Sequence, residues 1–471
     1  MKLEMKNIKY ILFGIGLFSL QSCFVAKEYS RSEKEIVNEQ YFRTDKISQD
    51  SLSIATLSWK EIFTDDKLTQ YINTALSNNL DIRIAIQNIE VAEAYMKQGK
   101  AAYFPVLNGS ASYTYANPSL NSSQGISFDK RQNLNQYDLS ANLSWEADVW
   151  GKIRSNQRAT SATYLQSISA HQAVKSNLVA SLASTYYQLL ALDAQREITV
   201  KNIQIREESL ETMLALKDAG NVTEVAVKQT EAQLLNTKAA LLDIDNSIKL
   251  LENTFCILLG ESPHAVERTK LSEQKINTEL TAGLPIQLLS NRPDIMAAEY
   301  NLINAFELTN VARSNFYPAL RLTASGGIQS MNFDNLFSAN SLFANLVASL
   351  TQPILNGRQI RTQYEVRKAQ QETALLNYKK VVLTASKEVS DALYTYQSNS
   401  EKIVLKQQEY EAYQAATEYS EELLRYGMAN YLEVLTAQQN ALSAELSVIN
   451  TELAKLNAII QLYKAVGGGW R

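Results

Sequence analysis

The chain has 471 residues, of which 45% are hydrophobic and 20% are charged, and its formal net charge is -4. This hydrophobic content argues against wholesale disorder, and the small acidic balance leaves no basic surplus for gripping nucleic acid. Two cysteines and two histidines are too few for a disulfide framework or a His/Cys metal centre.

Turn-forming residues are scarce and unevenly placed. The 16 glycines and 7 prolines are roughly 5% of the chain, where average usage is about 12%. Proline is absent from 119–262 and 354–471, and glycine is absent from 152–219 and 358–426. Ordinary globular domains need a turn about every 10 to 20 residues. These stretches therefore predict very long helices and exclude a compact enzyme of short elements.

The first 22 residues have the features of a secretory signal peptide. Three lysines precede the apolar run 11–20, which is too short to span a bilayer because a transmembrane helix needs about 20 residues. The sequence LQSC at 20–23 resembles a bacterial lipobox, with Gln21 as an unusual occupant. We expect cleavage before Cys23 and a covalent lipid on Cys23, which anchors the chain in the membrane. The alternative is an ordinary signal peptide followed by an incidental thiol.

Two halves of the chain follow one plan. Gly151, Gly220 and Gly260 are 69 and 40 residues apart, and Gly357, Gly427 and Gly467 are 70 and 40 apart. Aromatic-proline sequences at 103–105 and 316–318 repeat with an offset of 213 residues. A repeat this long predicts a duplicated domain rather than a solenoid.

Each half is predicted to hold a helix, two strands and a long helical hairpin. Asn79 and the NRPD sequence at 291–294 can start helices of about 23 residues, which end at the aromatic-proline sequences. Alternating apolar and polar residues then predict four strands of about 10 residues, the length of a transmembrane β-strand. These strands are expected at 107–115, 137–146, 320–328 and 342–350. A soluble β-sandwich shows the same alternation and remains an alternative.

The glycine-free stretches predict hairpins. An unbroken helix from Gly151 to Gly220 would rise about 100 Å, and Gly357 to Gly427 permits the same. Sevenfold apolar spacing in the segments that follow, such as Leu234 and Leu241, predicts antiparallel coiled-coil packing. Four strands cannot close a barrel and a membrane excludes open sheet edges, so we expect several copies to share one barrel.

Three sequence strings carry a family resemblance. They are LP at 284–285, NRPDIMAAE at 291–299 and FYPAL at 316–320. Together they closely resemble the signature of TolC-type outer-membrane efflux proteins, in particular the NodT subgroup of lipoproteins. The likeness runs from Cys23 to about Gly467. It implies a mainly α fold with a transmembrane β part, in which long antiparallel coiled-coil hairpins form an α-barrel. Four strands per chain complete a trimeric 12-stranded β-barrel.

The resemblance also implies partners and a domain plan. We expect a homotrimer in outer-membrane lipid, a periplasmic adaptor protein and a proton-driven inner-membrane exporter. The expected segments are a lipoprotein signal peptide at 1–22, an N-terminal anchor and extended segment at 23–68, a first efflux repeat at 69–263, a connecting equatorial segment at 264–290, and a second repeat at 291–471.

The family's adaptor-docking positions fall on the two hairpin tips. The corresponding residues are Gly220, Asn221, Val222, Gly427, Met428 and Ala429. Both glycines are also expected to end helices in a left-handed conformation, which is a structural role that any helical hairpin could need.

The family's aperture acids fall just after the second tip. Glu433 stands at one acidic position, and three copies around one axis would form a constriction that attracts cations. Thr436 stands three residues later, where the family often has a second acid. Ala429 and Ala226 stand where related proteins can have a basic latch residue and an acid, so the closing network is expected to differ, with Glu224 as a substitute acid.

No catalytic, metal or cofactor site is predicted beyond the lipid on Cys23. His171 and His264 are read as unaccompanied surface or loop residues, and Cys256 as a small core residue. A P-loop, a GxSxG sequence and an HExxH sequence are all missing, so we expect a passive conduit rather than an enzyme.

The sequence therefore predicts the outer-membrane channel component of a tripartite efflux system, gated at its periplasmic tip. Two alternatives have the same long helices. One is the exit duct of a protein secretion system, and the other is a periplasmic coiled-coil lipoprotein that forms no pore.

Overall fold

The computed structural model describes residues 25–31, 53–122, 130–274, 282–283 and 285–471. Cys23 and the predicted signal peptide lie outside the described residues. The chain divides into two compact units. One contains the described residues within Met1–Arg31, Glu90–Gln166 and Glu299–Asn377, and the other those within Ser32–Ile89, Ser167–Ala298 and Tyr378–Arg471.

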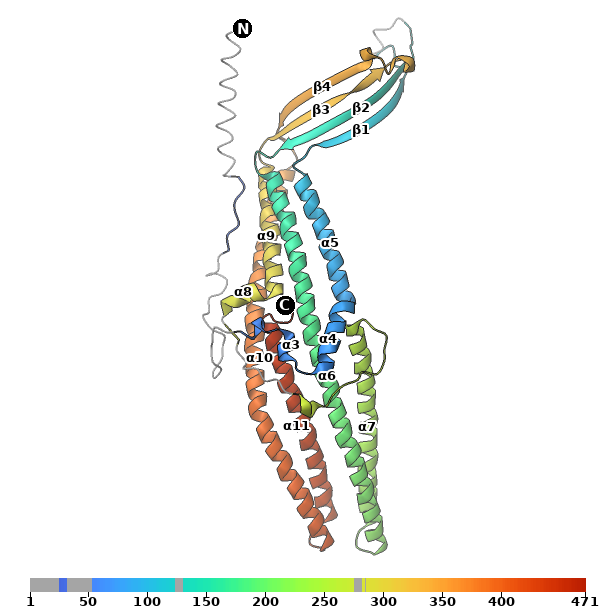
Figure 1. Cartoon of the computed structure of the whole chain (residues 1–471), viewed down its shortest axis with the longest axis vertical. Coiled ribbons are helices and arrows are strands. Elements are labelled where there is room, and N and C mark those ends of the chain that lie inside the picture. Colours follow the sequence, from blue (N-terminus) through green and yellow to red (C-terminus); the bar gives the residue numbers. More distant parts are fainter. Residues whose placement is uncertain (1–24, 32–52, 123–129, 275–281, 284) are drawn as a thin grey trace. The chain divides into compact units, whose positions relative to one another are not determined.

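The elements follow the same order in both halves of the chain (Figure 1). The first half contains α5 (Leu80–Ala101), β1 (Val106–Ala116), β2 (Leu134–Ala147), α6 (Lys152–Asp218) and α7 (Glu224–Leu259). The second contains α9 (Pro293–Ser314), β3 (Ala319–Ser330), β4 (Leu342–Thr351), α10 (Gln359–Arg425) and α11 (Tyr431–Ala465). Both α5 and α9 have 22 residues, and both α6 and α10 have 67. The predicted duplication, strands and uninterrupted helices are confirmed.

Shorter elements precede the first half, join the two halves and lie between β3 and β4. They are the helices α3 (Trp59–Ile62), α4 (Asp66–Asn78) and α8 (Leu288–Asn291), with 3₁₀ turns at Ile54–Thr56, Leu271–Glu273, Pro285–Gln287, Phe333–Asn335 and Ala339–Ser341. Asp65 starts α4 by accepting hydrogen bonds from the amides of Lys67 and Leu68.

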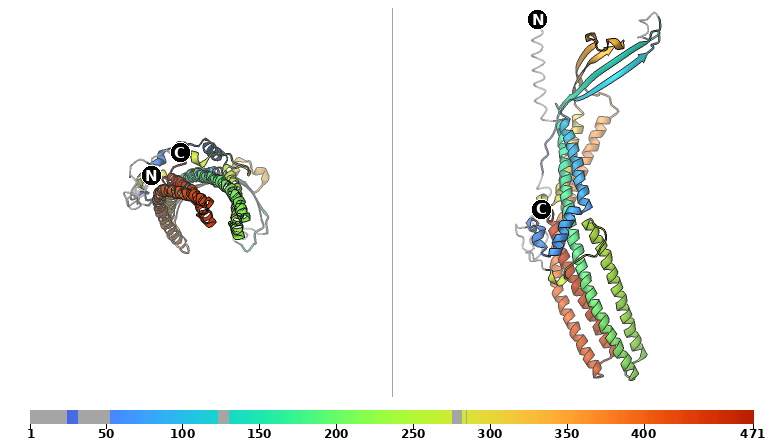
Figure 2. Two further views of the ribbon diagram at one scale, coloured as in Figure 1. Left: turned by 90° about the horizontal axis from the view of Figure 1, so that it is seen from below. Right: turned by 45° about the vertical axis from the view of Figure 1, so that its right-hand side comes forward.

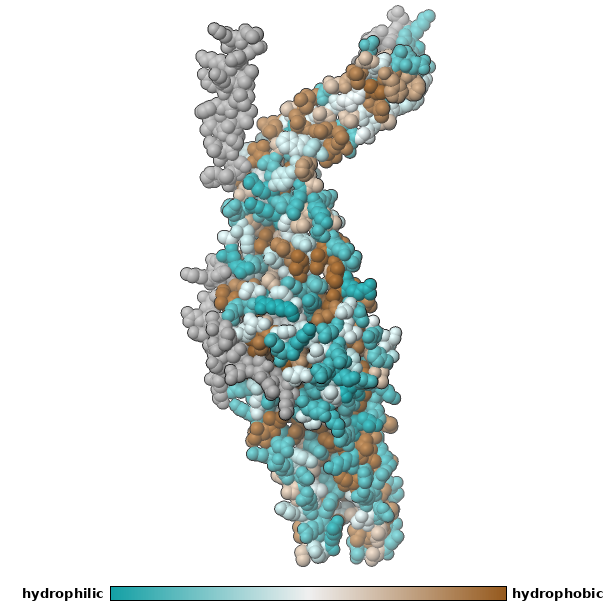
Figure 3. All heavy atoms as spheres, viewed as in Figure 1, coloured by the Kyte–Doolittle hydropathy of each residue, from teal (hydrophilic) through white to brown (hydrophobic). Residues whose placement is uncertain are grey.

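The four strands form one antiparallel sheet in the order β1-β2-β3-β4 (Figure 1). Their register sorts the two faces by polarity. One row across the sheet contains Leu107, Leu143, Ala324 and Leu346, and the next row contains Asn108, Asn142, Ser325 and Asn345. The apolar face stays uncovered, since Leu107 is 67% exposed and Leu346 is 68% exposed. Figure 3 shows apolar residues over this sheet. The described residues form a single sheet, so the soluble-sandwich alternative is wrong.

Within the described part of the chain, no helix combines the length and the apolar character that a membrane crossing requires.

The six spaced glycines mark the ends of the long elements. All of them have a positive φ, between 59° and 95°. Gly260 and Gly467 end the return helices of the two halves, and a Cβ at either would lie 2.6 Å or 2.4 Å from a backbone oxygen, that of Asn78 or Asn291. A side chain is therefore excluded at both positions for the same reason.

Asn79 and Arg292 hold equivalent places at the starts of α5 and α9. Asn79 accepts hydrogen bonds from the amides of Asp81 and Ile82, as predicted for a helix cap, and donates to the carbonyl oxygen of Leu258 at 2.9 Å. Arg292 donates to the equivalent carbonyl oxygen, that of Ala465, at 3.0 Å. Each half thus ties the start of its 22-residue helix to the end of its return helix.

The long helices pair as antiparallel hairpins. Arg196 pairs with Asp245, and Lys217 at the end of α6 pairs with Glu224 at the start of α7. The heptad residues Leu234, Ile248 and Phe255 are buried in α7, as are Leu435, Ile449 and Leu456 in α11. Leu432, in the first turn of α11, is 51% exposed. Figure 2 shows that the lower parts of α6, α7, α10 and α11 lie side by side in an arc.

Gly327 in β3 tests how closely the strands pack. An added Cβ would lie 2.2 Å from the Leu139 oxygen and 2.7 Å from the Ser140 Cα of β2. We predict that Gly327→Ala lowers the yield of folded protein and its thermal unfolding midpoint, at a cost of about 1–3 kcal/mol for the forced backbone shift. Gly326→Ala is the matched control, because its Cβ meets only the Phe343 oxygen at 3.5 Å. Equal midpoints for the two variants would contradict this register.

Candidate functional site

The two hairpin tips have the same backbone design. At the first tip the amides of Gly220 and Asn221 donate to the carbonyl oxygens of Lys217 and Leu216, both at 2.8 Å. At the second tip Gly427 and Met428 donate to Leu424 and Leu423, at 3.0 and 2.9 Å. This is the helix-ending arrangement that glycine favours, so the predicted left-handed caps are confirmed.

The tips expose apolar side chains. Met428 is 77% exposed, Tyr426 71% and Val225 60%. Neither tip glycine has another atom within 4 Å of the place where a Cβ would stand, so the surface around them is open. Clustered apolar groups on a soluble surface are typical of sites that bind another protein.

The two tips are tied to each other within one chain. Tyr431 begins α11 and donates a hydrogen bond from its hydroxyl to Gln229 Oε1 of α7, at 2.9 Å. Ala226 of the first hairpin is fully buried, and Ala429 of the second is half-buried. Neither alanine can supply a charged group. The two tips are instead joined by the Tyr431–Gln229 hydrogen bond, which the sequence did not predict.

Glu433 lies in the first turn of α11 with an exposed side chain. It has no ion-pair partner among the described residues, so its charge faces solvent. Thr436, one turn later, is also exposed, and its hydroxyl donates to the Leu432 carbonyl oxygen at 2.7 Å.

Glu224 has a different environment from Glu433. Its carboxylate lies 2.7 Å from Lys217 Nζ, across the first tip. The hydrogen bond and the charge of Lys217 lower the pKa of Glu224. The side chain predicted as a substitute aperture acid is therefore paired inside its own hairpin.

A groove of about 440 Å³ runs beside α6, α10 and α11, above the tips. Its lining contains four acids, Glu208, Glu418, Glu421 and Glu445, together with the basic residues Lys201 and Arg425. Burial raises the pKa of Glu445, which outweighs the opposing hydrogen bond that the Tyr410 hydroxyl donates to it at 3.3 Å. Gln438 is 6% exposed and donates to Glu421 at 2.9 Å.

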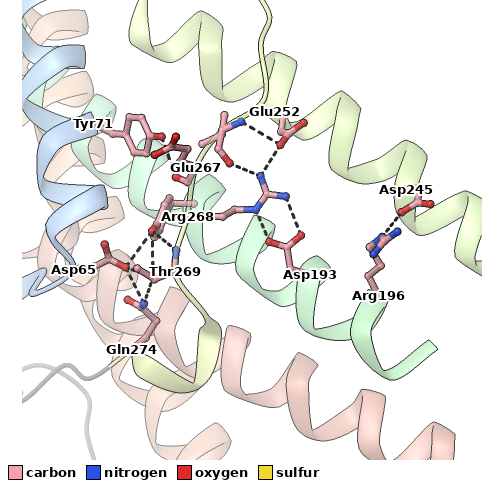
Figure 4. Close-up of polar contacts among 12 residues, drawn as sticks. Asp65, Tyr71, Asp193, Arg196, Asp245, Glu252, Glu267, Arg268, Thr269 and Gln274 are labelled. Carbon is pink, nitrogen blue, oxygen red and sulfur yellow. Dashed lines mark hydrogen bonds and ion pairs between the residues drawn. The ribbon is translucent and has the colours of Figure 1, made fainter. Parts of the chain in front are cut away.

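Arg268 ties the segment after α7 to the first hairpin (Figure 4). Its guanidinium binds Asp193 of α6 with two nitrogens and lies 2.6 Å from Glu252 of α7. The hydrogen bond with Asp193 raises the pKa of Arg268.

Asp65 forms a second polar cluster in the same region (Figure 4). Burial acts to raise its pKa, but hydrogen bonds from Thr269, the Leu68 amide, Gln274 and Tyr186 outweigh this effect and lower it. The contacts join the start of α4 to α6 and to the segment after α7. They stabilise the connecting region and place no reactive group in a cavity.

The N-terminal segment 25–31 lies against α9. The Asn310 side chain donates to the Lys27 carbonyl oxygen at 3.0 Å, and Arg313 donates to the Val25 oxygen at 3.3 Å. Arg31 binds the carboxylate of Glu299, which is 6% exposed. The segment therefore runs antiparallel to α9, with Val25 beside the end of α9 from which β3 starts.

The remaining cysteine and the histidines have structural surroundings. Cys256 is fully buried, as predicted. His264 lies in a loop as predicted but is not unaccompanied, because its Nδ1 lies 3.4 Å from Cys256 Sγ. Burial and the charge of Lys175 lower the pKa of His171. Among the described residues, no three or more His, Cys, Asp or Glu side chains are grouped to hold a metal ion.

A sheet with an uncovered apolar face, joined to two long helical hairpins, defines a channel subunit of the bacterial outer membrane. The family model described as outer membrane efflux protein matches residues 71–261 and 284–468. The chain belongs to this family, and its function is that of an outer-membrane channel component of an efflux system.

Individual relatives match almost the whole chain. The solvent efflux pump outer membrane protein SrpC of Pseudomonas putida is 30% identical over 423 residues, covering 90% of this chain and 89% of SrpC. The cation efflux system protein CusC of Escherichia coli O6:H1 is 28% identical and covers 99% of this chain and 100% of CusC. The solved outer-membrane channel OprN has a TM-score of 0.87 at 26% identity, covering 95% of this chain and 100% of OprN. These likenesses support efflux and neither of the two alternatives.

Glu445 gives a prediction about pH. A carboxyl group whose folded-state pKa is raised contributes stability below its unfolded pKa, near 4.5, and loses that contribution as the pH rises through the folded value. Glu445→Gln should therefore raise the thermal midpoint at pH 8, by about 1–3 °C, and leave it unchanged at pH 4. Glu411→Gln, on an exposed position of α10, is the control. A Glu445→Gln midpoint equal to wild type at both pH values would show that burial of this carboxylate has no cost.

Proposed function

We propose that three copies of this chain form a passive, water-filled duct through the outer membrane and periplasm. The observation that carries the proposal is the sheet with its apolar face uncovered and with β1 and β4 as edge strands. Open edges are excluded from a bilayer because their amide and carbonyl groups would lack partners. Pairing β4 of one copy with β1 of the next removes every edge and gives a barrel of 12 strands.

The long helices support the same assembly. Leu235 and Leu242 of α7 lie seven residues apart and are 59% and 70% exposed, and Leu376 and Leu383 of α10 repeat this spacing at 58% and 69%. Such stripes are typical of coiled-coil faces whose partner is missing. Neighbouring copies would cover them and continue the hairpins into a closed helical wall.

The duct is proposed to work with partners at its tips. The exposed apolar residues around Gly220, Asn221, Val222, Gly427, Met428 and Ala429 suit docking by a periplasmic adaptor protein. A proton-driven inner-membrane exporter would supply the energy, so this chain needs no catalytic residue. Relatives named for solvent and for cation efflux share this fold, which supports placing cargo selection in the pump.

Glu433 is proposed to form the aperture ring. Its unpaired charge and exposed position at the start of α11 support this role, with Thr436 one turn above it. Three carboxylates on one axis would narrow the duct and attract cations. Glu224 contributes less, since Lys217 balances its charge.

Planar-bilayer recordings test the aperture. Wild-type protein should show a small, cation-preferring conductance, and Glu433→Ala should raise the leak severalfold and weaken the preference for cations. Glu372→Ala removes one exposed acid from α10 far from the tips and should change neither property. Absence of conductance in wild type would contradict the proposed duct. An unchanged leak in Glu433→Ala would contradict the assignment of Glu433 to the aperture.

Cys23 is proposed to carry the lipid anchor. Val25, two residues later, lies beside Arg313 near the end of α9, the helix that leads into β3. Two residues span at most about 7 Å, which supports entry of acyl chains on Cys23 into the membrane near the sheet. Mass spectrometry of the mature protein should show an N-terminal acylated Cys23, and Cys23→Ser should lose the acyl mass. An unmodified thiol in the wild-type protein would contradict the anchor.

A further inference from the structure

Hydrogen bonds join α11 to the first hairpin along most of its length. We call this set the hairpin ladder. From the equatorial end to the tips its rungs are Ser184–Asn457 at 2.7 Å, Gln195–Asn450 at 3.0 Å, Arg206–Gln439 at 2.9 Å, Ser209–Gln438 at 3.5 Å and Gln229–Tyr431 at 2.9 Å. Because α11 carries Glu433, any widening of the aperture by movement of α11 must break the rungs nearest the tip.

Arg206 is the charged member of the hairpin ladder. It projects from α6 and is 2% exposed. Its Nη1 donates to Gln233 Oε1 of α7, and its Nη2 donates to Gln439 Oε1 of α11. One guanidinium therefore holds the return helices of both hairpins.

This guanidinium is incompletely compensated. Both acceptors are neutral amides, and its Nε has no hydrogen-bond partner. It forms no ion pair with the described residues, because the adjacent acids are engaged elsewhere: Glu207 with Lys238 at 2.7 Å and Glu208 with Gln204 at 3.2 Å. Burial of the guanidinium lowers the pKa of Arg206. A buried charge without a counter-charge favours any arrangement that hydrates it.

We propose that Arg206 is a positioning residue for the aperture, which locks α11 in the closed arrangement through Gln439 and is poised to release it. The proposal rests on the proposed function, in which Glu433 on α11 narrows the duct. Gln439 lies six residues after Glu433, a rise of about 9 Å along the helix, so holding Gln439 fixes the start of α11. Separation of the hairpins returns the guanidinium to water, which offsets part of the cost of the lost contact.

We call the contact between Arg206 and Gln439 the lock. It predicts different leaks for three variants. Arg206→Met keeps an unbranched apolar side chain and removes the donors, so the ratio of open to closed channel should rise about tenfold or more. Arg206→Lys keeps the charge with a single donor group and should restore part of the closure. Gln439→Glu supplies the missing carboxylate, so it should lower the leak below that of wild type.

Planar-bilayer recordings of the full-length, detergent-purified channel measure these leaks. Ser184→Ala removes the rung farthest from the tips and should leave the leak at the wild-type value. The double variant Arg206→Met/Gln439→Glu should lose the tight closure of Gln439→Glu, since the new carboxylate has no cation to meet. A purely structural role for Arg206 would lower the thermal midpoint without producing opposite leaks in Arg206→Met and Gln439→Glu.

The two proposals fail in different ways. If wild type gave no conductance, the duct itself would be wrong. If wild type conducted but Gln439→Glu closed no more tightly than wild type, the lock would be overturned even where Arg206→Met failed to fold, because Gln439→Glu retains Arg206.

Discussion

Two helices of 67 residues, each without an internal turn residue, impose the main constraint on this protein. A helix of that length cannot bury its apolar residues in one globular core, so it needs partners along its whole length. Within the chain each long helix receives one return helix of 36 or 35 residues, which covers only part of it. The exposed stripes that remain, and the sheet with two open edges, make assembly with other copies the way in which the fold becomes complete.

Comparison of the two halves shows which contacts are repeated and which differ. Both halves require glycine at Gly260 and Gly467, where the chain passes within contact distance of the residue two positions before the 22-residue helix, Asn78 or Asn291. Both tie that helix to the carbonyl oxygen of Leu258 or Ala465, yet one half uses Asn79 and the other uses Arg292. Arg292 also pairs with Asp294 and Glu388, each at 2.6 Å, so the second half has a charged clamp where the first has an amide. The backbone geometry is repeated more strictly than the side-chain chemistry.

Much of the fold could be predicted from the sequence because its signals are local. Alternation over about ten residues identifies a strand, and a glycine-free stretch between two glycines identifies a hairpin arm. The aperture role of Glu433 could be proposed only through a family resemblance, since a single acid in a helix carries no local signal. Contacts such as Arg206 with Gln439, Arg268 with Asp193, and Cys256 with His264 depend on the pairing of helix faces. Arg206 and Gln439 are 233 residues apart, and no periodicity links two polar residues across that distance.

The central claim is that copies of this chain surround one axis at the level of Glu433. The most direct measurement is block of single-channel current by Cd²⁺ after Glu433→Cys, because three thiolates meeting on an axis form a site for a soft metal ion. The account predicts reversible block of this variant at micromolar Cd²⁺ and much weaker block of wild type, whose Cys256 is buried and whose Glu433 carboxylates bind a soft metal ion less tightly than thiolates do. Unblocked current through folded Glu433→Cys channels would contradict it.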